Sequence, residues 1–559
     1  MRGVRIVAVL AVLFSGIMVV GASAQTERAT APQETTIDWR SCGNRAPYPG
    51  FDCAQVHVPL DYDAPHRQQI TLQVARLAAG NPDAKIGSIF LNPGGPGGSG
   101  RDFLFAAGPF LFSEEVREHF DLIGFDPRGI QLSTPLICFE TFEDSLLSFP
   151  PFPFPLDGVQ QAIEKAATEY LAANCDANGG SIIDHMSTAD VARDMDLMRE
   201  MIGEETFNYA GYSYGSFLGA VYANLFPDRV RALIVDGVLD PVEWTTGVGN
   251  AAETYPFSTR LGSDIGAQDT LDEFFRLCDA AGPPACAFAP DSSDRFDALA
   301  ETLLDAPIEI TDPFTGDVFP FTYADLIGSS LGPLYNSVSW PEQAEFLAFI
   351  EASASPAVLG AAFAATIEAA GLATLRLPAY PNFAEGFPGV ACSDSVNPDN
   401  YEAWPAAAAV AAEDSYFGEL WTHASVPCWN WPGFDEDGYL GPFTADTANT
   451  VLVASTTYDP ATPYHGALSL RNMLPNSSLV TVEGWGHTTL FLSACADALY
   501  SAYFLTGIAP ADGTVCTQDF TPFTFAPTAA AEDASAADTL VRREVRRSVM
   551  DEVALRPGR

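Results

Sequence analysis

A five-residue turn, Gly211-Tyr212-Ser213-Tyr214-Gly215, constrains the fold of this chain more than any other feature. A short aromatic stretch precedes it and a run of small and apolar residues follows it, which predicts a strand, a tight turn and a buried helix. The turn needs glycine on both sides of the serine because a Cβ there would clash where strand and helix meet. Ser213 then lies at a helix N-terminus, where backbone N–H groups favour developing negative charge. We expect Ser213 to be a nucleophile.

The second feature is a glycine-rich loop, residues 93–100, which follows a predicted buried strand. It lacks the Lys-Ser/Thr ending of a phosphate-binding loop. Glycines let the backbone come close to a scissile carbonyl, so that a bare N–H can donate to the oxyanion. We predict Gly95 N–H and Tyr214 N–H as the oxyanion donors, with Gly94 as the alternative to Gly95. A flexible loop without a catalytic part is the competing interpretation.

An acid and a histidine each follow a predicted strand in the last part of the chain. Asp459 follows residues 449–455, and His487 follows residues 478–482. The carboxyl ends of parallel strands meet at one edge of a sheet, so both side chains are expected beside Ser213. Asp459 would orient the imidazole of His487, which would take the serine proton. The alternatives are Ser99 as nucleophile, His465 as base, and Asp240 or Asp236 as acid.

Strand and helix signals alternate along the first part of the chain, which predicts an α/β fold with a mostly parallel central sheet flanked by helices. Asp126 and Arg128 follow one predicted strand, and we interpret them as a pair that fixes a turn. A crossover helix is predicted at 188–199, ahead of the strand that leads to Ser213. The sequence also predicts an opening hairpin at 54–60 and 70–76, further strands at 87–92 and 230–237, and a strand that ends in a turn within 120–129.

The pattern changes between residues 242 and 448, where Ala-rich helical segments alternate with Pro- and Gly-rich breaks. This stretch is far longer than one crossover connection needs. We interpret it as a large, mainly helical lid, inserted before the strand that carries Asp459, and a separate second domain is the alternative. The clearer helices are predicted at 270–277, 293–304, 340–354 and 405–421.

The N-terminus indicates an exported protein, and the acidic charge fits either a secreted protein or one from a salty habitat. The net charge of −45 argues against a nucleic-acid partner. Arg2 and Arg5 precede an apolar run at 6–20, and small residues up to Ala24 fit a cleavage site, so residues 1–24 are predicted to be a signal peptide. The protein would be secreted or periplasmic, and an uncleaved N-terminal anchor is the alternative. No later stretch is long enough for a membrane span, so no stable membrane insertion is expected after cleavage.

Ten cysteines in an exported chain predict disulfides. The absence of a C-x-x-C pair gives no support to a zinc site or a thioredoxin-like site. The spacing suggests that each cysteine pairs with its neighbour in the sequence, although other connectivities are compatible with the sequence. The hypothetical pairs are Cys42–Cys53, Cys138–Cys175, Cys278–Cys286, Cys392–Cys428 and Cys495–Cys516.

The last residues, 521–559, are of low complexity and end in an Arg-rich segment. We expect a disordered tail, with a short amphipathic helix that uses Leu540, Val541, Val545 and Val549 as the alternative. The chain is thus divided into a signal peptide (1–24), a first core part (25–241), the lid (242–448), a second core part (449–520) and the tail (521–559).

Five motifs together make a resemblance specific: G-G-P-G-G, D-P-R-G, G-Y-S-Y-G, Y-D-P-A-T-P and G-x-G-H. From roughly residue 36 to 516, the chain resembles the secreted tripeptidyl aminopeptidase-like branch of the prolyl aminopeptidase family, in the α/β-hydrolase superfamily. The resemblance implies a serine exopeptidase that removes short peptides or single residues from a free N-terminus, without a metal or organic cofactor. The chain departs from the prolyl aminopeptidases at Asn92-Pro93, where those enzymes usually carry a histidine, which bears on the oxyanion geometry.

The same three residues would also serve other functions. A small-molecule esterase or amidase would use Ser213, Asp459 and His487 in the same way, because the fold does not determine the substrate. A binding protein built on the same scaffold, without catalysis, is a third hypothesis. The predicted partner is therefore a peptide, or a small ester or amide.

Overall fold

A computed structural model describes residues 36–43, 46, 49–311, 318–354, 380, 382–524 and 536–553 of the chain. These residues belong to one unit that begins at Glu34. The predicted signal peptide, residues 1–24, lies outside the described residues. Among the helices that are described, none is both long enough and apolar enough to cross a membrane.

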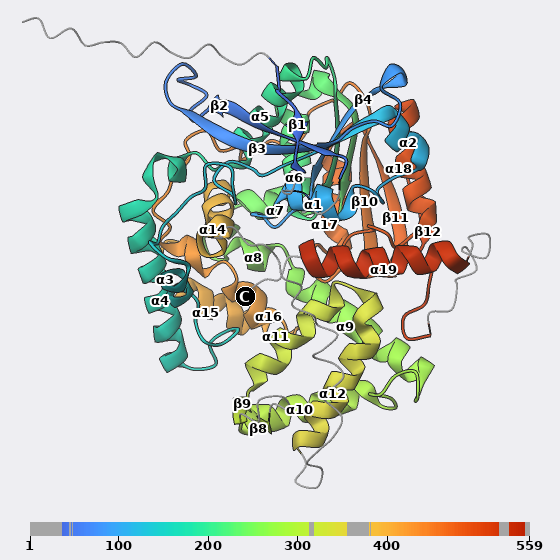
Figure 1. The fold of residues 1–559 in the computed structure, drawn as a ribbon. Helices are drawn as coiled ribbons and strands as arrows, with labels where there is room; N and C mark the ends of the chain where they lie inside the picture. The colour runs from blue at the N-terminus through green and yellow to red at the C-terminus, as the bar shows by residue number, and fades with distance from the viewer. Residues whose placement is uncertain are drawn as a thin grey trace, which may run out of the picture. The chain divides into compact units, whose positions relative to one another are not determined.

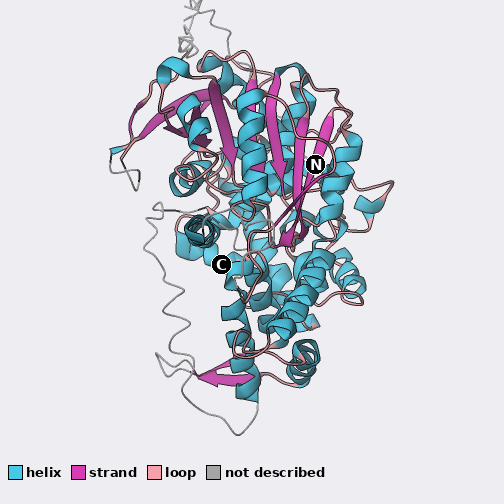
Figure 2. Ribbon diagram, turned by 90° about the vertical axis from the view of Figure 1, so that its right-hand side faces the viewer, coloured by secondary structure: helices cyan, strands magenta, loops and turns pink. Residues whose placement is uncertain are grey.

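A ten-stranded sheet organises the chain, and its strand order is β1-β2-β3-β5-β4-β6-β7-β10-β11-β12 (Figures 1 and 2). The first strands pair antiparallel, from β1 through β3 to β5, and all later pairs are parallel, so the predicted mostly parallel sheet is confirmed. The strands are β1 (Arg40–Ser41), β2 (Phe51–Pro59), β3 (Gln69–Leu77), β4 (Gly87–Asn92), β5 (Phe120–Phe125), β6 (Phe207–Tyr212), β7 (Val230–Asp236), β10 (Val451–Tyr458), β11 (Ser477–Trp485) and β12 (Thr514–Thr517).

Helices cover both faces of the sheet, which is why every residue of the central strands β4, β5 and β6 is buried. Neighbouring residues of one strand serve the two faces. Phe90 belongs to the apolar cluster on one face, and Ile89 and Leu91 belong to the cluster on the other. The first face packs against α5 (Thr188–Met201), α6 (Tyr214–Leu225) and α17 (Tyr464–Met473), and the second against α1 (Gly100–Ala107), α2 (Glu114–His119) and α18 (Ala494–Thr506).

Residues 242–448, the segment predicted to be a lid and called the lid below, supply most of a further apolar cluster, which contains the buried Trp340 and Phe274. One predicted helix, 405–421, is wrong, because the chain turns back between α15 and α16. A Cβ on Gly418 would lie 2.3 Å from the backbone of Ala411, which shows how closely the two helices approach. The lid elements are α7 (Pro241–Thr245), α8 (Phe257–Arg260), α9 (Ser263–Ala281), α10 (Ser292–Asp305), β8 (Ile308–Thr311), β9 (Val318–Phe321), α11 (Tyr323–Leu334), η7 (Ser337–Ser339), α12 (Trp340–Ala354), α14 (Phe383–Asp394), α15 (Ala403–Ala411), α16 (Gly418–His423) and η9 (Val426–Trp429).

A second segment joins the lid, and the sequence did not reveal it. Between β5 and α5 the chain forms α3 (Phe142–Ser145) and the long helix α4 (Gly158–Asn178). The carboxylate of Glu164 on α4 accepts hydrogen bonds from Tyr401 (2.7 Å) and contacts His423 of α16 (2.9 Å), and all three side chains are buried. The first core part therefore contains a helix that packs with the lid.

The tail contains a helix, α19 (Ala536–Val553), so the expected disorder is wrong for these residues. Of the four residues in the alternative prediction, Val549 is buried and Val545 packs against the core, whereas Val541 is exposed. The side chain of Leu540 lies outside the described residues. The apolar face of α19 consists of only a few residues, and it could not be recognised within a stretch of low-complexity composition.

All five predicted disulfides are present: Cys42–Cys53, Cys138–Cys175, Cys278–Cys286, Cys392–Cys428 and Cys495–Cys516. No cysteine of the described residues remains free. Each bridge joins two cysteines that are consecutive in the sequence, with separations from 8 to 37 residues.

Candidate active site

Ser213 occupies the turn between β6 and α6 in a conformation that L-residues rarely adopt, with φ 58° and ψ −127°. Its side chain is buried, at 7% exposure. The two flanking glycines are required by space. A Cβ on Gly211 would lie 2.2 Å from the carbonyl oxygen of Gly215, and one on Gly215 would lie 2.8 Å from that of Asn92. The sequence pattern thus forms the strained turn that it predicted.

His487 and Asp459 lie close together, because β10 and β11 are parallel neighbours and each residue follows one of them. Nδ1 of His487 lies 2.8 Å from Oδ1 and 3.0 Å from Oδ2 of Asp459. The carboxylate also accepts the backbone N–H groups of Ala461 and Thr462, both at 2.9 Å, and that of Thr488 at 3.0 Å. Burial alone would raise the pKa of Asp459, but the neighbouring imidazole of His487 and these hydrogen bonds hold it below its ordinary value.

The other ring nitrogen of His487 is the one left for proton transfer. Nε2 is buried and has no hydrogen-bond partner among the described residues. The imidazole packs edge-on against the ring of Tyr335, with 5.0 Å between the ring centroids. The backbone N–H of His487 donates to the backbone carbonyl of Tyr335 at 2.9 Å. Nδ1 is bound to an ionised carboxylate, so the neutral ring carries its proton there and Nε2 is a proton acceptor.

Asp236, at the end of β7, links the turn to the histidine loop. Its carbonyl oxygen accepts the N–H of Ser213 at 2.9 Å. Its carboxylate accepts the N–H of Thr489 at 2.9 Å and the Thr489 hydroxyl at 2.6 Å. One buried residue therefore bonds both to Ser213 and to the residue two positions after His487, which ties the serine turn to the histidine loop.

The competing candidates have other partners. The Ser99 hydroxyl caps α1 and donates to Asp126 at 2.5 Å. His465 is exposed on α17, and the carboxylate of Asp240 caps α7. Asp236 contacts Thr489 rather than an imidazole. The structure brings Asp459, and not these alternatives, to His487.

The glycine-rich loop runs directly beside Ser213. A Cβ on Gly94 would lie 2.7 Å from Cβ of Ser213 and 3.0 Å from the Tyr214 nitrogen. The N–H of Gly94 already donates to the side-chain oxygen of Asn92 at 2.9 Å. No such acceptor is present for the N–H of Gly95 among the described residues. The asparagine that departs from the prolyl aminopeptidase pattern therefore occupies Gly94 and favours Gly95 as the donor.

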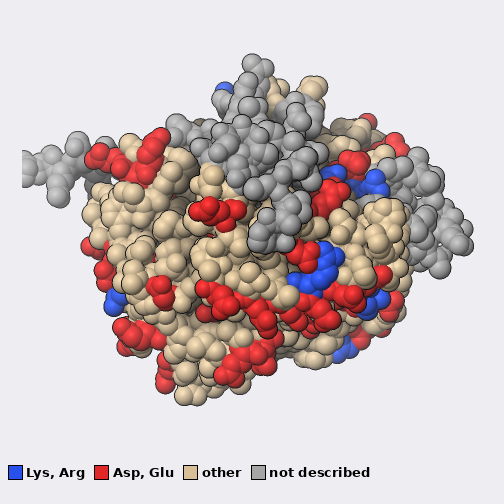
Figure 3. All heavy atoms as spheres, turned by 90° about the horizontal axis from the view of Figure 1, so that it is seen from below, with Lys and Arg blue, Asp and Glu red and all other residues tan. Residues whose placement is uncertain are grey.

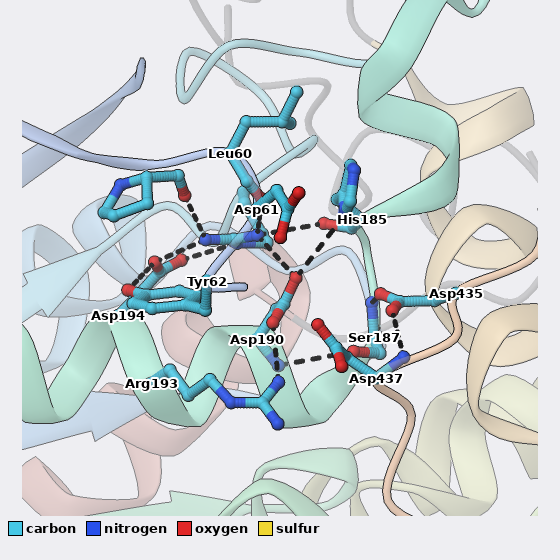
Figure 4. A network of polar contacts seen from close by, with 12 residues as sticks. Leu60, Asp61, Tyr62, His185, Ser187, Asp190, Arg193, Asp194, Asp435 and Asp437 are labelled. Carbon is cyan, nitrogen blue, oxygen red and sulfur yellow. Dashed lines mark hydrogen bonds and ion pairs between the residues drawn. The ribbon is translucent and has the colours of Figure 1, made fainter. Parts of the chain in front are cut away.

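The predicted pair of Asp126 and Arg128 is wrong, because each residue binds a different partner. Asp126 lies 3.3 Å from Arg101, whereas the completely buried Arg128 binds Asp194 (2.7 and 2.8 Å) and Asp190 (2.8 Å) on α5 (Figure 4). Its remaining donors reach the carbonyls of residues 59 and 60, each at 2.9 Å. A buried guanidinium has five donors, and one aspartate cannot accept from all of them.

Two lid carboxylates cap α5 close to the turn. Asp394 accepts from the Thr188 N–H (2.8 Å) and hydroxyl (2.6 Å), and Asp435 accepts from the Ser187 N–H at 2.9 Å. The Thr188 hydroxyl also bonds to the hydroxyl of Tyr214. Burial raises the pKa of Asp394 to about 7. The sequence could not reveal these contacts, because more than two hundred residues separate the partners.

His185, Asp190 and Asp435 lie close enough for their ligand atoms to surround a cation, within 4.8 Å of one another. However, Asp190 already binds the guanidinium groups of Arg128 at 2.8 Å and Arg193 at 2.7 Å (Figure 4). A metal ion would face these positive charges at short range. The group is therefore better described as part of an ion-pair network that fastens α5 to β2 and the lid.

The sheet order, the strained serine and the His487–Asp459 contact define a serine hydrolase of the α/β-hydrolase fold. A family model described as alpha/beta hydrolase fold matches residues 87–261, and one described as TAP-like protein matches residues 414–516. The chain belongs to this TAP-like family of α/β hydrolases.

Three curated relatives match over most of their length. Serine protease Hip1 of Mycobacterium tuberculosis is 30% identical over 539 residues, which cover 91% of this chain and 96% of that protein. Tripeptidyl aminopeptidase of Streptomyces lividans is 30% identical over 497 residues, 87% of each chain. Carboxylesterase B of Mycobacterium tuberculosis is 32% identical over 503 residues, 87% of this chain and 90% of that protein.

Proposed function

We propose that this chain is an exported serine aminopeptidase that releases short peptides or single residues from free N-termini. Ser213 is the nucleophile, His487 the base and then the acid, and Asp459 the residue that orients His487. The N–H groups of Gly95 and Tyr214 are the oxyanion donors. The observation that carries the proposal is the buried His487–Asp459 contact of 2.8 Å beside the strained Ser213 turn.

The reaction follows from this geometry. Oγ of Ser213 attacks the carbonyl carbon of the scissile amide while Nε2 of His487 takes the hydroxyl proton. The two N–H groups stabilise the negative charge on the carbonyl oxygen of the tetrahedral intermediate. His487 then gives its proton to the leaving amine, and an acyl-enzyme forms on Ser213. Water attacks the acyl group, with His487 again as base, and the N-terminal product leaves.

Export and peptide cleavage have separate support. Five disulfides are typical of proteins from oxidising compartments, and they agree with the predicted signal peptide. The names of the serine protease and the tripeptidyl aminopeptidase support a peptide substrate. Acidic side chains outnumber basic ones on the face that Figure 3 shows, which would attract the ammonium group of a free N-terminus.

A second candidate function is a small-molecule esterase, which the similarity to carboxylesterase B favours. The test compares a chromogenic amide of a free tripeptide, its N-acetylated counterpart and a simple acyl ester, with Ser213→Ala as the blank for each. The aminopeptidase proposal expects cleavage of the free-amine peptide and loss of that cleavage on acetylation. Ester turnover that does not depend on a free amine, with no cleavage of the peptide, would favour the esterase.

A further inference from the structure

The C-terminal helix α19 lies at the junction of sheet and lid, beyond the last residue that the TAP-like family model matches. Figure 1 shows it crossing below the ends of β10 and β11, above α9. Its buried residues serve both sides. Val549 belongs to the apolar cluster that contains α1 and α18, whereas Met550 belongs to the lid cluster. The helix is therefore packed against both the sheet side and the lid.

One side chain of α19, Arg546, reaches the histidine loop and is completely buried. Its guanidinium donates to the carbonyl oxygens of His487 (3.0 Å) and Tyr335 (3.3 Å), and also to that of Leu490. Within the described part of the chain it forms no ion pair. Its bonding partners are thus the backbone carbonyls of His487 and of the residue three positions later, and that of the lid residue whose ring packs against the imidazole.

Gly486, the residue before His487, lies close to the same guanidinium and to the Tyr335 carbonyl. Gly486 has φ +114°, and a Cβ on it would lie 3.2 Å from Nη2 of Arg546 and 2.8 Å from the Tyr335 carbonyl oxygen. The last glycine of the G-W-G-H sequence therefore makes room for a guanidinium that comes from the C-terminal helix. The G-x-G-H motif and helix α19 of the tail are therefore in direct contact.

Burying a guanidinium that pairs with no carboxylate is unfavourable, and here burial lowers the pKa of Arg546 to about 9. Buried acids partly compensate for this cost, because Asp236, Asp459 and Asp497 all act electrostatically on Arg546. A helix that merely covered apolar surface would place an apolar side chain here. Arg546 instead donates hydrogen bonds to the backbone carbonyls of His487, Leu490 and Tyr335, which an apolar side chain could not do.

We propose that Arg546 is a positioning residue for His487, and that turnover depends on the docking of α19. The inference rests on the proposed function, because it assumes that His487 transfers protons. A guanidinium that holds the carbonyls of residues 335, 487 and 490 keeps the imidazole from shifting relative to Ser213. A misplacement of about 1 Å in such a site costs about a hundredfold in rate.

The test compares Arg546→Met and Arg546→Lys with Arg547→Met in the full chain. Arg547 is the matched control, because it is the next residue of the same helix and pairs with Glu342 on the lid rather than with the histidine loop. We would measure kcat and KM for the free tripeptide amide, the rate at which a fluorophosphonate labels Ser213, and Tm. All assays are run well below the lowest Tm.

For Arg546→Met we expect kcat and the labelling rate to fall about ten- to a hundredfold while KM changes less than about twofold. Arg546→Lys should lie between this variant and the wild type, and Arg547→Met should match the wild type. If Arg546→Met does not fold, Arg546→Lys decides: lower kcat at an unchanged Tm supports the proposal, and wild-type kcat overturns it.

Wild-type rates in Arg546→Met, or an equal loss in Arg547→Met, would also overturn the positioning role. The labelling rate separates this inference from the proposed function. If the wild type is labelled at Ser213 but cleaves no peptide, the aminopeptidase proposal fails. The comparison of labelling rates between the Arg546 and Arg547 variants still decides whether Arg546 positions His487.

Discussion

Two neighbouring strand ends each carry a buried aspartate, and the two aspartates behave differently. Asp459 follows β10 and Asp236 ends β7, and these strands are parallel neighbours in the sheet. Both side chains are almost completely removed from solvent. Yet the pKa of Asp459 lies below its ordinary value, whereas burial raises that of Asp236 to about 6 against the hydrogen bonds from Thr489.

The difference lies in the donors that surround each carboxylate. Asp459 accepts three backbone N–H groups and faces the imidazole of His487. Asp236 accepts from one residue, Thr489, with the Tyr500 hydroxyl more distant at 3.4 Å. Burial therefore does not make a carboxylate a triad acid. The turn that supplies the N–H groups keeps Asp459 ionised, so that it can stabilise an imidazolium.

The largest expected effect tests whether Ser213 is the nucleophile on which both aspartate roles depend. Ser213→Ala should lower kcat by about 10⁶-fold, as removal of the nucleophile does in other serine hydrolases, because no acyl-enzyme can form. Tm should stay close to that of the wild type. Turnover and Tm are measured on the same preparation, and retained turnover would show that the reaction uses another nucleophile.

The next effect separates the two aspartates. Asp459→Asn should lower kcat about 10⁴-fold, because the amide can hold the imidazole in the wrong tautomer. Asp236→Asn is the matched control and should lower kcat less than about tenfold, since the replaced carboxylate contacts Thr489 and Tyr500 and not the imidazole, and the substitution keeps the backbone carbonyl that accepts the N–H of Ser213. Steady-state kinetics on both variants check this order. Similar losses in the two variants would mean that the acids share the role.

A smaller effect concerns the loop that Asp236 holds. Thr489→Val removes the hydroxyl that donates to Asp236 at 2.6 Å and leaves a buried carboxylate with one donor fewer. We expect a loss of about 1–3 kcal/mol in the free energy of unfolding, with a modest decline in kcat. Denaturant unfolding measures the stability. An unchanged denaturation midpoint would show that the Tyr500 hydroxyl and the Thr489 backbone N–H are enough to stabilise the Asp236 carboxylate.

The smallest effect is in the pH dependence of stability. The pKa of Asp236 is about 6 in the folded state and 3.8 ordinarily, so between these values the folded state binds more protons than the unfolded chain. The contribution of Asp236 to stability therefore falls as pH rises from about 4 to about 6. The free energy of unfolding of Asp236→Asn, minus that of the wild type, should rise over this range.

For Asp459→Asn the trend should have the opposite sign. The lowered pKa of Asp459 gives the wild type a stability that is present above the ordinary pKa and is lost as pH falls through the folded-state value. Denaturant unfolding of both variants at several pH values provides the measurement. Parallel pH trends in the two variants would contradict the contrast between the two carboxylates.

The sequence predicted those parts of the molecule that depend on interactions between residues close together in the chain. The Ser213 turn, the sheet and the disulfides each follow from spacing within a short stretch of chain. The glycine at 211 is demanded by the carbonyl oxygen of Gly215, four residues away, and apolar runs such as 207–212 are long enough to identify a buried strand. The glycine at 215 faces the distant Asn92 instead, and only the motif as a whole predicted it. The identity of the acid beside His487 was also predictable, because both residues follow adjacent strands.

Contacts between distant segments could not be predicted. Arg546 meets the carbonyl of a residue 59 positions earlier, and Thr188 meets Asp394 at a separation of 206. Arg128 was assigned the wrong partner because sequence proximity favours Asp126, whereas burial demands more acceptors than one carboxylate has. The tail was expected to be disordered because its few apolar residues gain their packing only from surfaces formed elsewhere.

The disulfide pattern has a consequence for the way the chain matures. Because every bridge joins consecutive cysteines, a chain that emerges from a translocation channel N-terminus first obtains its correct bridges by oxidising each new cysteine with the one just before it. Eight cysteines alone allow 105 connectivities, yet this rule selects one without reshuffling. Neither the sheet nor the lid depends on a bridge to a distant cysteine, so in a chain exported as proposed above, the order in which the cysteines emerge would be enough to select the bridges.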